Sequence, residues 1–234
     1  MASRIAIALV ATFVVASGLQ EVLPAQETIF NVPSPDVLEA GRLYVETDQY
    51  VRSWNTRSGR AGFFLLRAVA GVGHAVEIGL NSGSFDYRHA SEPFVDATVK
   101  WRPLRTATAG VVIGDNTGRG VGGRSPAALR SLGYASGFVV APSTRTRAAV
   151  GPYCATRNVF GDAARCGALL TVEQPVFGPG GFELAADWFS GAGGYATAGV
   201  IGTIHRVALY AGYGFANTGR QDDLVTLELG LTLF

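Results

Sequence analysis

Few histidines are available in this chain for acid–base chemistry. The three histidines, His74, His89 and His205, fall in turns or loops between apolar runs. Acyl transfer needs a nucleophile such as serine beside a base, and His89 with Ser91 is the pairing that the sequence offers. A lone histidine in a polar loop is usually just solvated. The sequence therefore predicts no catalytic residues and indicates that the protein is not an enzyme.

Cys154 and Cys166 are the two cysteines, and neither has a histidine near it in the sequence. Because structural zinc sites use four cysteine or histidine ligands, this pair does not predict one, and neither a metal nor a cofactor is expected. In an oxidising compartment the two cysteines are predicted to form a disulfide across the loop that starts at Asn158. Two unpaired thiols are the alternative.

Charged residues within the apolar runs recur at alternate positions, and successive side chains of a strand point to opposite faces. One face of each run is therefore apolar and the other carries the charges. In a membrane barrel the charged face turns inward, where it lines a pore or forms a hydrated, salt-bridged interior. The candidate pore-lining residues are Glu46, Asp48, Arg67, Glu77, Asp96, Lys100, Arg102, Arg147, Glu183, Asp187 and Glu228.

The elements that position these side chains are runs of alternating residues, broken by Gly, Pro, Asn or Arg. Strands of about 9–11 residues cross a bilayer when tilted. The sequence predicts an all-β fold, a closed antiparallel transmembrane β-barrel of about twelve strands. The expected strands are Arg42–Ser53, Arg60–Ala70, Ala75–Gly83, Phe94–Arg102, Ala109–Asn116, Leu132–Ala141, Thr146–Arg157, Gly167–Pro175, Gly181–Phe189, Tyr195–Ile204, Arg206–Ala216 and Leu224–Phe234.

Residues 1–25 have the pattern of a secretory signal peptide. Arg4 supplies the positive start, residues 5–16 are mostly apolar, and small residues follow at 16–18. A membrane-anchoring helix is the weaker alternative, because about 20 apolar residues are needed to span a bilayer. The sequence thus predicts export.

The domain organisation that follows is a lead segment and a barrel. Residues 26–41 show no strand alternation, and we expect them inside or under the barrel mouth. Ser34 and Pro35 are suited to begin a short helical turn there. Residues 42–234 make up the barrel.

The composition is apolar without an apolar helix. The mean hydropathy is +0.24, charged residues make up 16%, and the net charge is +1. A chain that is apolar overall, but in which apolar and polar residues alternate, fits a barrel whose wall of strands faces lipid. A balance so close to neutral argues against nucleic acid as a partner.

The connections between the expected strands alternate between short turns and longer or more polar loops. In outer-membrane barrels the short turns are periplasmic. Trp101 and Trp188 fall near strand ends on the apolar face, where they are predicted to form a membrane-interface girdle, with ordinary core aromatics as the alternative.

The last run, Glu228–Phe234, resembles the C-terminal strand of bacterial outer-membrane β-barrel proteins, which usually end in an aromatic residue. Residues Val72–Asn81 look like a turn and strand of small porin-like barrels. The resemblance implies contact with outer-membrane lipid and with barrel-assembly machinery during biogenesis. It departs from the family because Thr232, Gly230 and Glu228 hold the places in phase with Phe234, so either Leu233 takes the terminal role or a bulge resets the register.

Three functions remain open at this point. The first is a narrow porin-like channel for ions or small polar solutes, or a structural wall protein, in the bacterial outer membrane. The second is a soluble secreted β-protein that binds a ligand or partner. The third is a barrel hydrolase. The sequence gives no oligomeric state.

Overall fold

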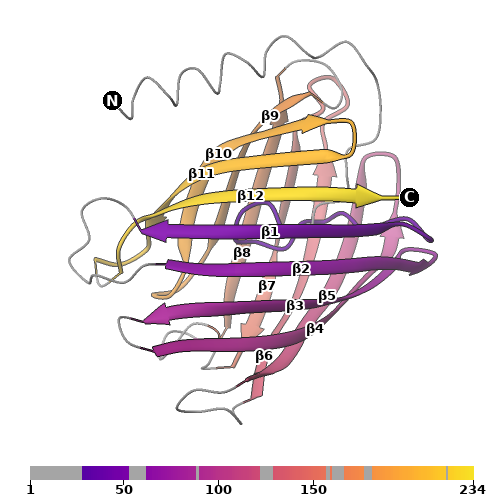
Figure 1. The fold of residues 1–234 in the computed structure, drawn as a ribbon. Helices are drawn as coiled ribbons and strands as arrows, with labels where there is room; N and C mark the ends of the chain where they lie inside the picture. Colours follow the sequence, from indigo (N-terminus) through magenta and orange to yellow (C-terminus); the bar gives the residue numbers. More distant parts are fainter. Residues whose placement is uncertain are drawn as a thin grey trace.

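Twelve antiparallel strands close into one barrel, with each strand paired to its neighbours in chain order and β12 paired to β1 (Figure 1). This computed structural model describes residues 28–52, 62–87, 90–121, 129–156, 159, 166–176, 181–219 and 221–234, and only the backbone of 85–87 and 90–92. The predicted fold class is confirmed. The strands are β1 (Leu43–Arg52), β2 (Gly62–Gly73), β3 (Val76–Tyr87), β4 (Ala90–Arg105), β5 (Ala109–Gly120), β6 (Leu129–Val140), β7 (Arg147–Ala155), β8 (Cys166–Pro175), β9 (Phe182–Phe189), β10 (Tyr195–Ile204), β11 (Val207–Ala216) and β12 (Leu224–Leu233).

The largest departure from the predicted strands is between β3 and β4. The sequence predicts a loop at Ser84–Pro93, but the two strands stay paired as far as Tyr87 and Ala90. Backbone pairing does not depend on apolar alternation once strands extend past the lipid, so the polar sequence hid these strand ends.

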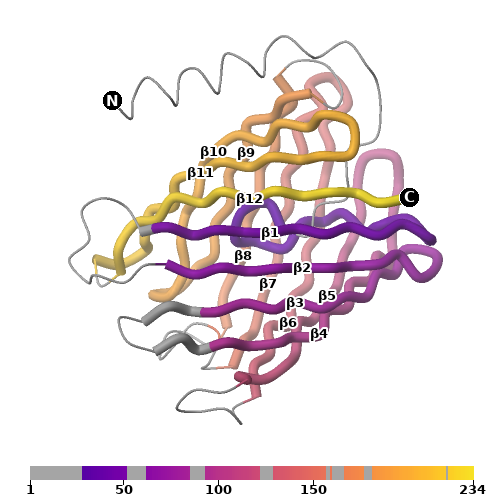
Figure 2. Tube along the Cα trace, viewed as in Figure 1, coloured from indigo at the N-terminus to yellow at the C-terminus, as the bar shows by residue number. Residues whose placement is uncertain are grey.

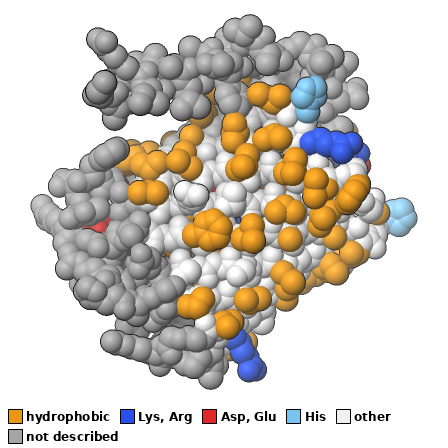
Figure 3. Space-filling model, viewed as in Figure 1, with side chains coloured by type: hydrophobic (Ala, Val, Ile, Leu, Met, Phe, Trp, Pro, Cys, Tyr) orange, Lys and Arg blue, Asp and Glu red, His pale blue; other side chains and the backbone are white. Residues whose placement is uncertain are grey.

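The two faces of the wall differ sharply in polarity. On the outer face Leu80 is 59% exposed and Leu229 is 45% exposed, whereas Glu77 and Glu228, on the inner face of the same strands, are buried. Figure 3 shows one side of the barrel, where hydrophobic side chains spread over the wall and the basic side chains in view lie mainly at its edges. An apolar outer face with charges inside is the arrangement of a membrane barrel, and the chain has the fold of an outer-membrane β-barrel.

β6 faces the opposite way from the sequence-based assignment. The rule that bulky apolar residues share the lipid-facing side of each strand predicts that Tyr134 and Phe138 face lipid, but Tyr134 is 5% exposed inside the barrel and Phe138 packs against the same buried cluster. Small residues, including Gly133 and Gly137, occupy the outer face instead. The aromatic side chains turn inward because Val32 and Val37, which precede β1 in the chain, pack against them inside the barrel.

β12 settles the register question that its sequence raised. The strand pairs without a shift to β1 on one side and β11 on the other, so no bulge resets it. Leu227, Leu229 and Leu231 are exposed on the outer face, and Thr226 and Glu228 are buried inside. Phe234 lies beyond the last paired residue.

The chain before β1 runs inside the barrel, where the indigo tube loops behind β1 in Figure 2. Residues 28–38, called the inner segment below, are largely buried. The helical turn expected at Ser34 and Pro35 does not form, because the Ser34 Oγ accepts the Asp36 N–H at 2.9 Å in a tight non-helical turn. The expected signal peptide, residues 1–25, lies outside the described residues.

Among the described residues, no helix is long and apolar enough to cross a membrane.

Candidate functional site in the barrel lumen

The predicted pore-lining residues all belong to strands of the barrel wall, and their role in a pore stays a prediction. Nine of the eleven are buried, and Arg102 and Arg147 are half-buried. They divide into groups that contact one another or the inner segment. The buried ones are Glu46, Asp48, Arg67, Glu77, Asp96, Lys100, Glu183, Asp187 and Glu228.

Asp187 on β9 holds one end of the inner segment. Its Oδ2 accepts the backbone N–H groups of Phe30 at 3.1 Å, Asn31 at 2.5 Å and Val32 at 2.8 Å. The Tyr50 hydroxyl donates to the Phe30 carbonyl at 2.6 Å from β1. A carboxylate that accepts several backbone N–H groups forms strong, charge-assisted hydrogen bonds, so Asp187 anchors this turn of the chain.

The other end of the inner segment is held by an ion-pair network near the short turns. The Arg147 guanidinium donates to both oxygens of Asp36 at 2.7 and 2.8 Å and also binds Glu173. The Lys100 ammonium lies 2.8 Å from Glu77 and donates to the Asp36 carbonyl at 3.1 Å. Two-pronged arginine–carboxylate pairs fix geometry as well as charge, so Asp36 is held firmly in place.

Apolar contacts complete the packing of the inner segment. Val32 and Val37 lie in a buried cluster of wall residues that contains Val112, Tyr134, Tyr153, Leu169 and Phe189. Phe30 lies in a second buried cluster with Ala185, Ile201, Ala208 and Tyr210 of β9 to β11. Apolar contacts and charged anchors together therefore hold the inner segment against the wall.

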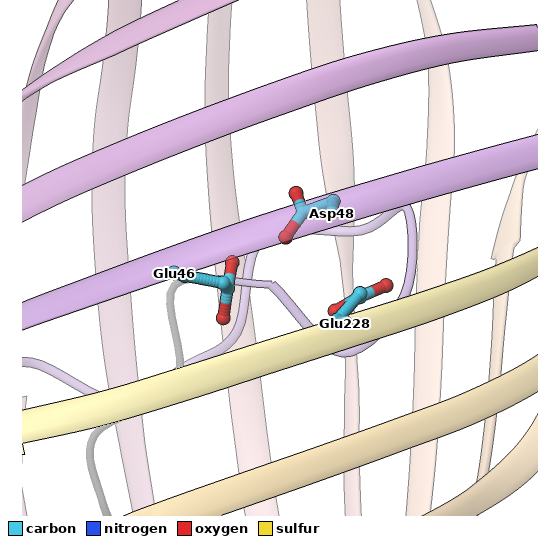
Figure 4. A group of neighbouring side chains, drawn as sticks. All are labelled: Glu46, Asp48 and Glu228. Carbon is cyan, nitrogen blue, oxygen red and sulfur yellow. The ribbon is translucent and has the colours of Figure 1, made fainter.

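Three carboxylates converge where the barrel closes. Glu46 and Asp48 project from β1 and Glu228 from β12, and Figure 4 shows them turned toward one another. One oxygen of each lies within 4.8 Å of the others. Arg67 on β2 supplies a positive charge, with its Nε 2.9 Å from Asp48 and 3.3 Å from Glu46.

Hydroxyl groups orient the carboxylates of this cluster. The Tyr44 hydroxyl donates to Glu46 Oε2 at 2.6 Å, and the Thr226 hydroxyl donates to Glu228 Oε1 at 3.0 Å. Sequence reasoning missed Tyr44, Thr226 and the anchor Asp36. Tyr44 and Thr226 each lie two residues from an inward acid, and that spacing was the available signal.

The lumen carries an excess of negative charge. Among the described residues, the buried acidic side chains number eight and the buried basic ones three, and the half-buried Asp36, Arg102 and Arg147 add one negative and two positive charges. A buried charge is costly unless it is paired, so this surplus attracts protons or cations. The acids are Glu46, Asp48, Glu77, Asp96, Glu173, Glu183, Asp187 and Glu228, and the bases are Arg67, Lys100 and Arg130.

Trp101 and Trp188 both point outward, with side chains 49% and 37% exposed. Trp101 lies at the end of β4 near the short turns, and Trp188 lies at the end of β9 near the longer loops. The Trp188 Nε1 donates to Asn217 at 3.0 Å. Their role as a membrane girdle stays a prediction.

Cys154 on β7 and Cys166 on β8 are joined by a disulfide in the structure, and the two residues are direct cross-strand partners. The bond links the two strands at the end where the β7–β8 connection leaves the wall. It lies away from the lumen and does not hold the inner segment.

The outer wall carries a polar group that the sequence analysis did not single out. On β5, Asp115 accepts the Thr117 hydroxyl, and it also accepts the Ser131 hydroxyl from β6 at 3.2 Å. These positions share the outward phase of Ile113, which is 43% exposed. His89, the base of the Ser–His pairing that the sequence offers, lies outside the described residues, and the side chain of Ser91 is not described.

No family model matches the chain, and no curated protein matches it either. Among solved structures, it is similar to outer membrane phospholipase A from Escherichia coli, at 14% identity over 82% of this chain and 92% of that chain, with a TM-score of 0.44. It is also similar to LpxR from Salmonella typhimurium, at 9% identity over 83% of this chain and all of that chain, with a TM-score of 0.46. Likeness at this level transfers no activity.

The prediction that the protein is not an enzyme is contradicted by these neighbours, one of which is named as a phospholipase. The prediction rested on the small number of histidines and on their places in turns and loops. This does not exclude catalysis, because carboxylates also serve as general bases.

Proposed function

We propose that the protein is an outer-membrane channel that prefers cations and is closed at rest by its inner segment. The acidic lumen is the observation that carries this proposal. A barrel wall that needs only to be rigid is served by neutral or balanced side chains. Rings of carboxylates attract cations and repel anions, which is how many pores select by charge.

The contacts that hold the inner segment in the lumen are of a kind that can break, which would open the channel. The inner segment is held by hydrogen bonds and ion pairs, through Asp187 at one end and Arg147 at the other. Water can replace such contacts when the segment moves. Gly41 joins the segment to β1 with a φ of +83° and no atom within 4 Å of its missing Cβ, which provides a pivot.

The charge preference is tested by the reversal potential of the purified protein in planar bilayers under a potassium chloride gradient. We expect infrequent openings with a reversal potential displaced toward that of potassium. A displacement toward chloride contradicts an acidic conducting lumen. The absence of any conductance, with the barrel folded, favours a structural wall protein.

A second candidate, ester hydrolysis at the outer wall, is favoured by one observation. Ser131 donates to Asp115 on the face that contacts lipid. In such a pair the carboxylate accepts the serine proton while the serine oxygen attacks the ester carbonyl, and the alcohol leaves with that proton. Water then hydrolyses the acyl-serine, which releases the fatty acid and restores the serine. His74 and His205, the histidines that the structure describes, lie in turns at the other end of the wall, and among the described residues Asp115 is the base in contact with Ser131.

Ser131→Ala tests this candidate against the matched variant Ser136→Ala, since Ser136 lies on the inner face of the same strand. If the wall is catalytic, fatty-acid release from phospholipid in detergent micelles is lost in Ser131→Ala and kept in Ser136→Ala. No release by the wild-type protein, or equal release by all three, removes the hydrolase.

A further inference from the structure

The carboxylate cluster at the seam of the barrel brings three acidic side chains beside one basic one, Arg67, in the part of the chain that the structure describes. Glu46 and Asp48 are fully buried and Glu228 is 3% exposed. In the ion pairs described above, Arg67 binds Asp48 and Glu46. Three carboxylates with one guanidinium at this depth leave a surplus that a proton or a cation has to offset.

Glu228 supplies an observation that is independent of charge counting. Its Oε1 accepts the Thr226 hydroxyl, but its buried Oε2 has no hydrogen-bond partner among the described residues. The side chain is turned toward Glu46 and Asp48 (Figure 4). A buried carboxylate oxygen without a donor is costly, and a bound cation would satisfy it.

The register makes the cluster a feature of barrel closure. Asp48 of β1 lies directly across from Glu228 of β12, and these are the first and last strands. Like charges directly opposite one another on paired strands are destabilising. A cation between them converts this repulsion into a link between the two ends of the sheet.

The atoms that the cluster offers as ligands determine which kind of cation it can bind. The cluster offers carboxylate oxygens, with the Tyr44 hydroxyl beside Glu46 at 2.6 Å, and neither sulfur nor imidazole. Hard divalent cations prefer oxygen donors, and calcium tolerates irregular geometry and bidentate carboxylates. From this we infer that Glu46, Asp48 and Glu228 form a divalent-cation site, suited to calcium, that clasps β1 to β12.

The test measures binding and stability, not conduction, so a silent channel leaves it intact. Chelator-treated protein in detergent is titrated with calcium chloride alone by calorimetry, and its thermal unfolding midpoint is recorded with and without calcium. We expect one equivalent to bind and to raise the midpoint by several degrees. Glu228→Gln is expected to weaken binding by about tenfold or more and to lose the rise in the midpoint. Glu183→Gln, which removes a buried inward carboxylate from β9, keeps both.

Terbium provides a readout that needs no variant. Because Tyr44 contacts the cluster, bound terbium gives tyrosine-sensitised emission that calcium displaces. If Glu228→Gln does not fold, Asp48→Asn serves for the same comparison. The site is ruled out if wild-type protein binds neither ion, or if calcium stabilises wild-type and Glu228→Gln protein equally. A midpoint that rises in Glu228→Gln without any calcium effect shows that the cluster holds a proton instead.

Discussion

Asp187→Ala is expected to open the barrel to ions. The substitution removes one acceptor that serves three backbone N–H groups of the inner segment, at 3.1, 2.5 and 2.8 Å. Hydrogen bonds to charged groups contribute about 1.5–3 kcal/mol each, and they are not additive, so we take about 3 kcal/mol for the three together. That shifts the ratio of closed to open barrels by about a hundredfold.

The measurement is potassium efflux from liposomes that contain equal amounts of folded protein. Efflux is expected to rise strongly in Asp187→Ala and less in Asp187→Asn, which keeps an acceptor but not the charge. Glu183→Gln is the matched control, because Glu183 lies on the same inward face of β9 and makes none of the contacts described for the inner segment. Equal efflux from Asp187→Ala and Glu183→Gln contradicts the anchoring role.

Leu229→Arg is expected to impair folding into lipid vesicles. Leu229 lies in the middle of β12, on the outer face, and is 45% exposed to the surroundings of the barrel. An arginine that faces lipid at mid-depth costs about 2–4 kcal/mol. Heat-modifiable migration on gels reports the folded fraction, and this fraction is expected to fall sharply.

Leu229→Ala is the control, because it removes the same side chain without adding a charge. It is expected to fold nearly as well as the wild type. If Leu229→Arg and Leu229→Ala fold with equal yield, the outer face of β12 does not contact lipid, and a soluble barrel becomes the better account.

Alternation along the chain was sufficient to predict the number and order of the strands, because the two faces of a membrane barrel differ in polarity along most of each strand. The run at Leu224–Leu233 shows why, since Leu227 and Leu229 meet lipid while Thr226 and Glu228 meet the interior. The same local pattern named charged residues that the structure buries inside the barrel.

The contents of the lumen were not predictable from that pattern. Residues 26–41 carry no periodicity that states where they pack, so their place inside the barrel was one expectation among others. Tyr134 of β6 faces inward because Val32 and Val37 of the inner segment offer it an apolar partner. The rule that apolar side chains face lipid and polar side chains face a watery interior does not predict an apolar surface inside the barrel.

The carboxylate cluster was also beyond the sequence, although its members were all named as inward residues. Glu46 and Asp48 approach Glu228 only because the first strand pairs with the last in one register. Closure of the sheet sets that register, and neither strand contains a local signal for it. Without knowledge of the β1–β12 register, the sequence indicates only three separate inward-facing acidic residues.

Single-channel recording of the wild type and of Asp187→Ala, side by side in one potassium chloride gradient, tests the central claim most directly. The account predicts rare openings in the wild type, frequent openings in Asp187→Ala, and a preference for potassium in both. If both proteins, shown to be folded, are silent, or if both conduct equally, the inner segment does not close a channel in this barrel.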